Sequence, residues 1–209
     1  VFKFYYQAWV IMGLACAFAL YRLSAGRSLL GKVWKTVVLL FVCFGLYYPL
    51  AASLTRAIAE GRGPLTLDGT AYLREVNPAD YEAILWLNEN VEGTPVILEA
   101  TGGSYTYYAR VSTHTGLPTV LGWDFHELQW RGSYEEPARR KPDISRLYVT
   151  PDPEEARELV RKYGIRYVYI GPLERETYGL TPEAEEKFSR FATLVYDRNG
   201  VKIFACSIP

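Results

Sequence analysis

The fold of this chain follows from two uncharged apolar stretches, FYYQAWVIMGLACAFALY (residues 4–21) and TVVLLFVCFGLYYPLAASLT (residues 36–55). A helix needs roughly 20 apolar residues to cross the hydrocarbon core of a bilayer, so both stretches are long enough to span it. A signal peptide would have a shorter apolar core, of about 7 to 15 residues. Both stretches also lack the polar face that a surface helix of a soluble protein needs. The sequence therefore predicts two transmembrane helices.

The connector between the two stretches sets the expected orientation. It holds four basic residues and no acidic one: Arg22, Arg27, Lys32 and Lys35. A short loop of this charge is typical of the cytoplasmic side of a membrane. We therefore expect residues 1–56 to form the membrane part with a basic cytoplasmic loop, residues 57–66 to be a linker, and residues 67–209 to form a domain outside the cytoplasm, on the cell membrane. Pro49 is expected to kink the second helix or mark its outer end.

The start of the chain indicates a piece of something larger. The chain does not begin with Met, and its first residues already enter a predicted membrane segment. We expect it to be the C-terminal part of a polytopic protein, with catalytic groups elsewhere in that protein.

Composition excludes some functions. Basic and acidic residues balance at 23 each, so no net field attracts nucleic acid, and we expect no nucleic-acid partner. Cys16 and Cys43 lie inside the apolar stretches and Cys206 near the C-terminus, so no disulfide framework or metal-ligand spacing is present.

The remaining residues predict an α/β domain. Helix-cap residues and apolar periodicity predict helices over residues 79–90, 153–163 and 182–191. Strands are expected at residues 95–99, 119–121, 165–171, 193–197 and 201–206, with the last two joined in a hairpin at Asn199-Gly200. This alternation of strands and helices favours a largely parallel sheet with the C-terminal hairpin as an antiparallel edge.

One segment combines the residue types that chemistry needs. Residues 99–131, EATGGSYTYYARVSTHTGLPTVLGWDFHELQWR, contain both histidines of the chain among aromatic, charged and glycine residues. Aromatic rings beside carboxylates and amides suit a sugar, whose apolar faces stack and whose hydroxyls form hydrogen bonds. We therefore predict a substrate site that opens as a cleft toward the membrane, formed by Glu99, Tyr105, Arg110, Trp123, Asp124, His126, Glu127 and Arg131.

Other interpretations of this segment remain open. Its glycines lack the G-x-G-x-x-G spacing of a nucleotide loop, and His126-Glu127 lacks the second histidine of a zinc protease. Asp124, His126 and Glu127 could gather a divalent metal together with His114, although no ligand spacing supports this, and we predict no metal site. The same side chains could simply orient a loop, with Arg110 and Arg131 as partners of the carboxylates.

Four stretches carry a resemblance to a known family. FKFYYQAW, PVILEATGGSYTYYARVSTHTGLPTVLGW, HELQWRG and YGIRYVYIGPLER resemble the C-terminal part of the uncharacterised YYY membrane protein family, which is similar in layout to the GT-C glycosyltransferases. That layout implies a lipid-linked sugar donor, a glycan or protein acceptor, and a catalytic acid in an outer loop that this chain does not contain. Trp123-Asp124 is similar to the signature with which oligosaccharyltransferases hold an acceptor peptide.

The resemblance implies a C-terminal fragment of a glycosyltransferase-like membrane enzyme, whose outer domain assists substrate binding. Such a fragment alone should not turn over substrate. We expect the fragment to bind no cofactor, although the whole protein could use a divalent metal. We expect membrane lipid to surround its two helices. The alternative is a non-enzymatic envelope protein whose outer domain binds a glycan or a partner protein. A third hypothesis is a metal-dependent hydrolase built on Asp124, His126 and Glu127.

Overall fold

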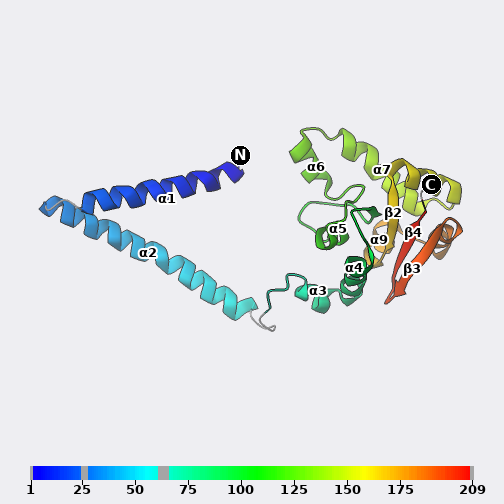
Figure 1. Cartoon of the computed structure of the whole chain (residues 1–209), viewed down its shortest axis with the longest axis horizontal. Coiled ribbons are helices and arrows are strands. Elements are labelled where there is room, and N and C mark those ends of the chain that lie inside the picture. The colour runs from blue at the N-terminus through cyan, green and yellow to red at the C-terminus, as the bar shows by residue number, and fades with distance from the viewer. Residues whose placement is uncertain (1, 25–27, 61–65, 208–209) are drawn as a thin grey trace. The chain divides into compact units, whose positions relative to one another are not determined.

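The computed structural model describes residues 2–24, 28–60 and 66–207. The chain divides into two compact units, Val1–Thr66 and Leu67–Pro209 (Figure 1). Arg27 of the basic connector, and Gly61, Gly63 and Pro64 of the predicted linker, lie outside the described residues.

The first unit consists of two helices, α1 (Phe2–Ser24) and α2 (Leu29–Glu60). Both are long and apolar enough to cross a membrane, and none of their apolar windows is buried in the structure, unlike the core helices of a soluble protein. Both helices are longer than predicted. Ser28 explains the early start of α2, because its hydroxyl accepts a hydrogen bond from Gly31 N at 3.1 Å.

Pro49 lies inside α2, which continues to Glu60, so this proline does not mark the end of the helix. The helix therefore takes in residues 57–60 of the predicted linker. The sidedness of the two helices stays a prediction.

The second unit is an α/β domain. Its elements are α3 (Ala71–Val76), α4 (Pro78–Asn90), β1 (Val96–Leu98), α5 (Arg110–Thr115), α6 (Asp124–Arg131), α7 (Glu135–Val149), α8 (Pro153–Tyr163), β2 (Ile165–Ile170), α9 (Pro172–Tyr178), α10 (Pro182–Glu186), the 3-10 helix η1 (Lys187–Arg190), β3 (Ala192–Arg198) and β4 (Val201–Cys206).

Local signals explain several of these boundaries. Asp152 caps α8 by accepting a hydrogen bond from Glu154 N at 3.0 Å, and Gly164 ends that helix in the left-handed conformation, with φ of 62°. The β3–β4 hairpin turns through Asn199 and Gly200, both with positive φ, as predicted for this turn.

The four strands form one mixed sheet in the order β1-β2-β4-β3. The β1–β2 pair is parallel, whereas β4 runs antiparallel to both β2 and β3. The prediction of one sheet with the hairpin at its edge is confirmed, but the prediction of a largely parallel sheet is wrong. The physical reason is that β4 of the hairpin pairs with β2. The β4 strand therefore lies inside the sheet, and both of its pairings are antiparallel.

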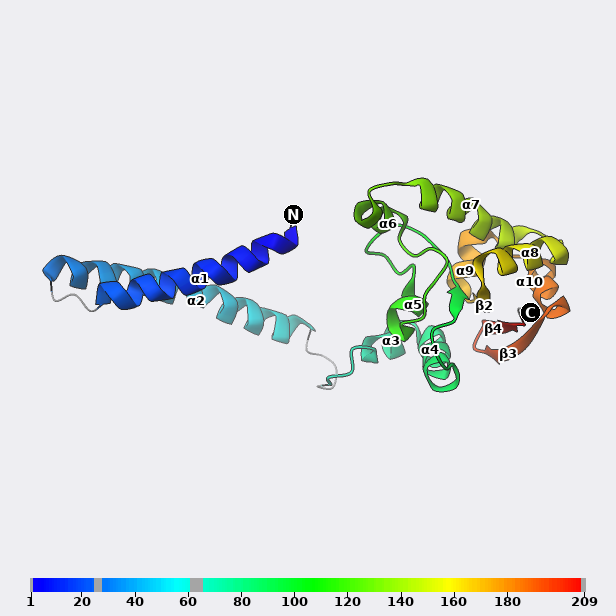
Figure 2. The same ribbon diagram turned by 45° about the horizontal axis from the view of Figure 1, so that its top comes forward.

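Helices cover both faces of this sheet. On one face, Ile144 and Leu147 of α7 and Phe188 of η1 pack against strand residues such as Val168 in a buried cluster. On the other face, α4 and α5 pack against strand side chains that include Ile97, Tyr169 and Ile203. Figure 2 shows α4 and α5 on the side of the strands opposite to α8 and α10. The domain thus has three layers, and α5 is held on the face that carries the candidate site.

Two more sequence predictions need correction. Residues 119–121 form no strand but an isolated bridge between Thr119 and Ile97, because the chain leaves the sheet edge after one residue. The helix predicted from Pro182 to Phe191 changes to a 3-10 helix after Glu186, and its tighter turn places Lys187 and Phe188 in the interior.

Candidate functional site

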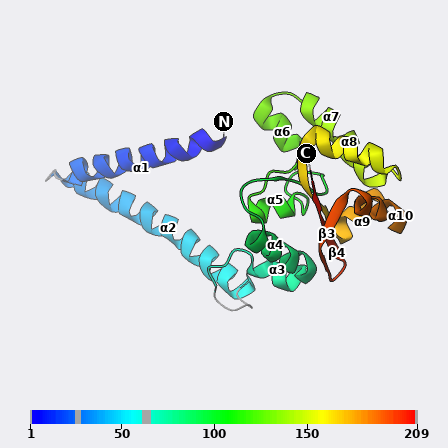
Figure 3. The same cartoon turned by 45° about the vertical axis from the view of Figure 1, so that its right-hand side comes forward.

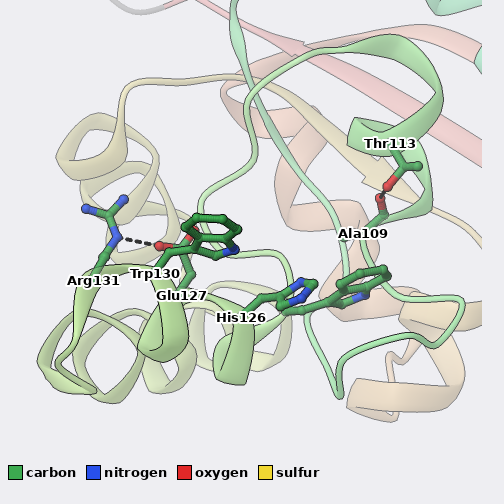
Figure 4. A pocket seen from close by; sticks show the side chains of 7 residues that line it. Ala109, Thr113, His126, Glu127, Trp130 and Arg131 are labelled. Carbon is green, nitrogen blue, oxygen red and sulfur yellow. Dashed lines mark hydrogen bonds and ion pairs between the residues drawn. The ribbon is translucent and has the colours of Figure 1, made fainter. Parts of the chain in front are cut away.

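An open pocket of about 440 Å³ lies between α5 and α6. Figure 4 shows His126, Glu127, Trp130 and Arg131 projecting from α6 on one side, with Ala109 and Thr113 of the α5 region opposite. The residues that line it are Ala109, Thr113, Trp123, His126, Glu127, Trp130 and Arg131.

Aromatic rings form most of the wall on the α6 side. The Trp123 indole is fixed by a 2.8 Å hydrogen bond from its Nε1 to Tyr108 O. The His126 ring lies 5.2 Å from the Trp123 ring and 5.0 Å from the Tyr105 ring, between centroids. The Tyr105 hydroxyl lies 3.1 Å from His126 Nε2. Trp130 keeps 68% of its surface exposed, so part of this aromatic side chain can contact a ligand.

An ion pair supplies the charge of the pocket. Glu127 and Arg131 lie one turn apart on α6 and their side chains form a salt bridge. The hydrogen bond to Glu127 raises the pKa of Arg131 above its ordinary value. Both side chains stay partly exposed, so they can exchange part of this contact for hydrogen bonds to a ligand.

The loop beside the pocket is strained. Tyr105 and Ala109 both have φ of 60°, a left-handed conformation that non-glycine residues adopt at a cost of roughly 1–3 kcal/mol. Gly102, which forms a parallel bridge with Trp123, has no room for a side chain, because a Cβ there would lie 2.2 Å from Tyr108 Cδ2. Strain of this kind concentrates at ligand sites, and here it lies at the pocket wall.

Asp124 is buried outside the pocket lining, where it anchors α6. Its carboxylate is buried and accepts hydrogen bonds from Lys141 Nζ at 2.8 Å and from the Tyr134 hydroxyl at 2.9 Å. Burial raises the pKa of Asp124, but these two bonds outweigh it and leave the pKa below its usual value. Because Lys141 belongs to α7, the contact holds α6 beside α7 (Figure 3).

A second group of charged residues is buried around Arg110, the first residue of α5. Arg110 Nε lies 2.6 Å from Asp80 Oδ2, and its Nη2 lies 2.9 Å from Glu174 Oε2. Burial alone would lower the pKa of Arg110, but the two carboxylates raise it above its ordinary value. Burial likewise opposes the charge of Asp80, yet the hydrogen bonds from Arg110 and Tyr169 leave the pKa of Asp80 lowered.

Glu99 is the third buried carboxylate of this group and receives no bond from the guanidinium. Its two oxygens accept hydrogen bonds from Val111 N and Ser112 N, both at 2.8 Å. Burial raises the pKa of Glu99 to about 7, against the opposing effect of these two backbone N–H groups.

The structure therefore divides the predicted site residues into two groups. Trp123, His126, Glu127 and Arg131 line the pocket, and Tyr105 contacts His126 at its edge. The remaining three, Glu99, Arg110 and Asp124, lie buried outside the pocket lining.

Sequence reasoning missed Ala109, Thr113 and Trp130, which also line the pocket. A helix over residues 124–131 would have revealed Trp130, because positions 126, 127, 130 and 131 share one helix face.

The alternative metal set does not form. Within the described part of the chain, no group of three or more His, Cys, Asp or Glu side chains could hold a metal ion. Asp124 is occupied by Lys141 and Tyr134, whereas the His114 imidazole pairs with the Tyr72 hydroxyl at 3.0 Å. The physical reason is that α5 and α6 direct His114 and Asp124 to different partners.

Comparisons with known proteins show a structural likeness. The chain matches no family model and no curated protein. Among solved structures, it is similar to the C-terminal globular domain of an oligosaccharyltransferase from Archaeoglobus fulgidus, with 18% sequence identity and a TM-score of 0.37. The match covers 62% of this chain and 97% of that domain. At this identity and score, the likeness carries no inference about function.

Proposed function

We propose that this chain is the C-terminal part of a glycosyltransferase-like membrane protein, and that its outer domain binds the sugar of a substrate in the pocket between α5 and α6. The observation that carries the proposal is the pairing, in one open pocket, of Trp123 and Trp130 with the Glu127–Arg131 ion pair. The lipid-linked donor and the glycan or protein acceptor are parts of the same proposal.

The chemistry of the pocket suits a carbohydrate. A sugar ring presents C–H groups on its faces, which pack against indole rings, and hydroxyls around its edge. Glu127 accepts hydrogen bonds from hydroxyls and Arg131 donates to them. The open side of the pocket leaves room for a chain of several sugars, because Trp130 and Arg131 are both exposed at its edge.

The membrane part of the proposal rests on α1 and α2. Their apolar side chains are exposed along helices that are long enough to span a bilayer, and such a surface is stable when lipid covers it. The basic connector supports an orientation in which Leu67–Pro209 lies outside the cytoplasm.

One observation favours the second candidate, a non-enzymatic envelope protein that binds a glycan. Among the described lining residues, the one carboxylate is Glu127, and it is held by Arg131 rather than left to act as an acid or base. An acidic residue in the first outer loop of a preceding segment of the same protein would favour the enzyme; a preceding segment without one would favour the binding protein.

Two exposed aromatic residues of α6 provide a matched test of the binding proposal. Trp130 lines the pocket, whereas Phe125, of which 62% is exposed, does not. The whole chain in detergent is screened against a panel of oligosaccharides, and affinities for the ligands found are measured by calorimetry. Trp130→Ala should weaken binding at least about fivefold, because an aromatic contact contributes roughly 1 kcal/mol beyond its buried area. Phe125→Ala should bind like wild type. Equal losses in both variants, or no ligand in the panel, would refute the pocket.

A further inference from the structure

Helix α5 forms one wall of the pocket but is too short to be stable without contacts from the rest of the fold. It spans only Arg110–Thr115, and a helix of this length is not stable by itself in water. Its N-cap residue is Ala109, whose methyl side chain forms no capping hydrogen bond. The free N–H groups of its first turn therefore need partners from elsewhere in the fold.

Glu99 supplies those partners. It directly follows β1, is fully buried, and uses one carboxylate oxygen for Val111 N and the other for Ser112 N. The two bonds join the end of a sheet strand to the first turn of α5.

The pocket residues of α5 lie within the same turn. Ala109 O accepts hydrogen bonds from Thr113 N at 3.0 Å and from Thr113 Oγ1 at 2.7 Å. Both residues line the pocket (Figure 4), so a shift of the first turn moves this wall. The opposite wall is anchored by the contact of Asp124 with Lys141, and the hydrogen bond from Trp123 Nε1 to Tyr108 O joins it to the backbone beside Ala109.

We propose that Glu99 is the positioning residue of the pocket: its carboxylate caps α5 from β1 and so sets the place of Ala109 and Thr113 opposite α6. The role rests on the proposed function, because positioning has a purpose only if the pocket binds a ligand. Glu99 does not touch the pocket and acts through the backbone of α5.

The charges around Glu99 agree with this role. Arg110 of α5 favours its ionised form, whereas Glu174 of α9 opposes it. Burial raises the pKa of Tyr148 in α7, and the charges of Glu174 and Glu99 add to that shift. Arg110 bonds Asp80 and Glu174 instead, so the hydrogen bonds of the Glu99 carboxylate come from the backbone N–H groups of Val111 and Ser112. Protonation of Glu99 turns one of its acceptor oxygens into a donor, so the cap should weaken below the pKa of about 7.

The test compares Glu99→Gln with a control that loses stability elsewhere. The control is Ile144→Val, a change in the buried cluster on the other face of the sheet. Amide hydrogen exchange of the whole chain is measured at pH 8 and pH 6 and corrected for intrinsic rates. In Glu99→Gln, the amides of Val111 and Ser112 should exchange at least tenfold faster than in wild type at pH 8. Their protection should fall from pH 8 to pH 6 in wild type and stay constant in the variant.

Exchange in Ile144→Val should keep the wild-type protection at Val111 and Ser112. Oligosaccharide affinity should fall at least tenfold in Glu99→Gln and stay unchanged in the control. Unchanged protection of the two amides would overturn the positioning role whether or not a sugar binds. Faster exchange with full affinity would also overturn it, whereas a wild-type chain that binds no sugar would refute the proposed function itself.

Discussion

Arg110 is the residue whose loss should destabilise the α/β domain most clearly. Its guanidinium is buried and bonds both Asp80 and Glu174, so Arg110→Met would leave two buried carboxylates without their cation. Methionine has a similar length and no charge, and it fills most of the vacated volume. The variant therefore removes the charge contacts with little change in packing.

The expected magnitude follows from the two contacts. Breaking a buried ion pair by removing one partner costs roughly 3–5 kcal/mol. We expect the free energy of unfolding to fall by about 4 kcal/mol near pH 7. Two ion pairs are broken, but protonation of one of the two unpaired carboxylates reduces the combined cost. A domain of this size loses about 3 °C of Tm per kcal/mol, which predicts a drop of about 12 °C.

The assay is thermal unfolding of the whole chain in detergent, followed by near-ultraviolet circular dichroism, which reports tertiary packing around aromatic residues. The control is Arg139→Met, which removes an exposed pair with Glu136 and should change the melting temperature little, because water screens such a pair. The triple variant Arg110→Met, Asp80→Asn, Glu174→Gln should recover part of the loss, because it removes the unpaired charges. An Arg110→Met variant that melts within about 2 °C of wild type would refute the reasoning.

Three further predictions concern titration, packing and topology. The pKa of Glu99 is raised from 4.5 to about 7. In the pH window between these two values, the folded domain keeps a proton that the unfolded chain has lost. The free energy of unfolding should therefore fall by about 3 kcal/mol as the pH rises through the window, and denaturant midpoints should show no such fall in Glu99→Gln. Gly102→Ala should cost roughly 1–3 kcal/mol in thermal unfolding, because its Cβ overlaps the Tyr108 ring, whereas Gly103→Ala meets Thr106 Cγ2 only at 3.8 Å and should be near neutral; equal melting of the two would contradict this. A cysteine at Ser28 should react with an impermeant maleimide only from the cytoplasmic side and one at Ser133 only from outside, and labelling of both from the same side would reject the orientation.

Local signals in the sequence predicted the elements that depend on local contacts. Helix α8 begins and ends where Asp152, Pro153 and Gly164 predict, because helix caps act within one turn of the helix. The Asn199-Gly200 turn determines the hairpin in the same way. The helix α7 was missed because Pro142 lies inside it and its sequence is strongly charged, so its buried face consists of a few widely spaced residues such as Ile144 and Leu147.

Contacts between distant segments could not be predicted in this way. The direction of β4 beside β2 depends on how the hairpin packs, and the apolar pattern of a strand does not encode direction. Glu99 and Arg110 were grouped with the pocket because polar residues in a loop commonly hold ligands. Arg110 is buried with Asp80 and Glu174, which lie far away in the sequence, and Glu99 is buried against the backbone N–H groups of Val111 and Ser112.

The central claim is that a sugar binds against Trp123 and Trp130. The most direct measurement is an NMR titration of the whole chain with ¹⁵N-labelled tryptophan, in which each of its five indole N–H signals is assigned by substitution. Oligosaccharide should shift the signals of Trp123 and Trp130 along one saturable curve and leave Trp86, which packs against Tyr196 elsewhere in the domain, unchanged. A sugar that binds and shifts Trp86 but neither pocket indole, or a panel that shifts none of them, would contradict the claim.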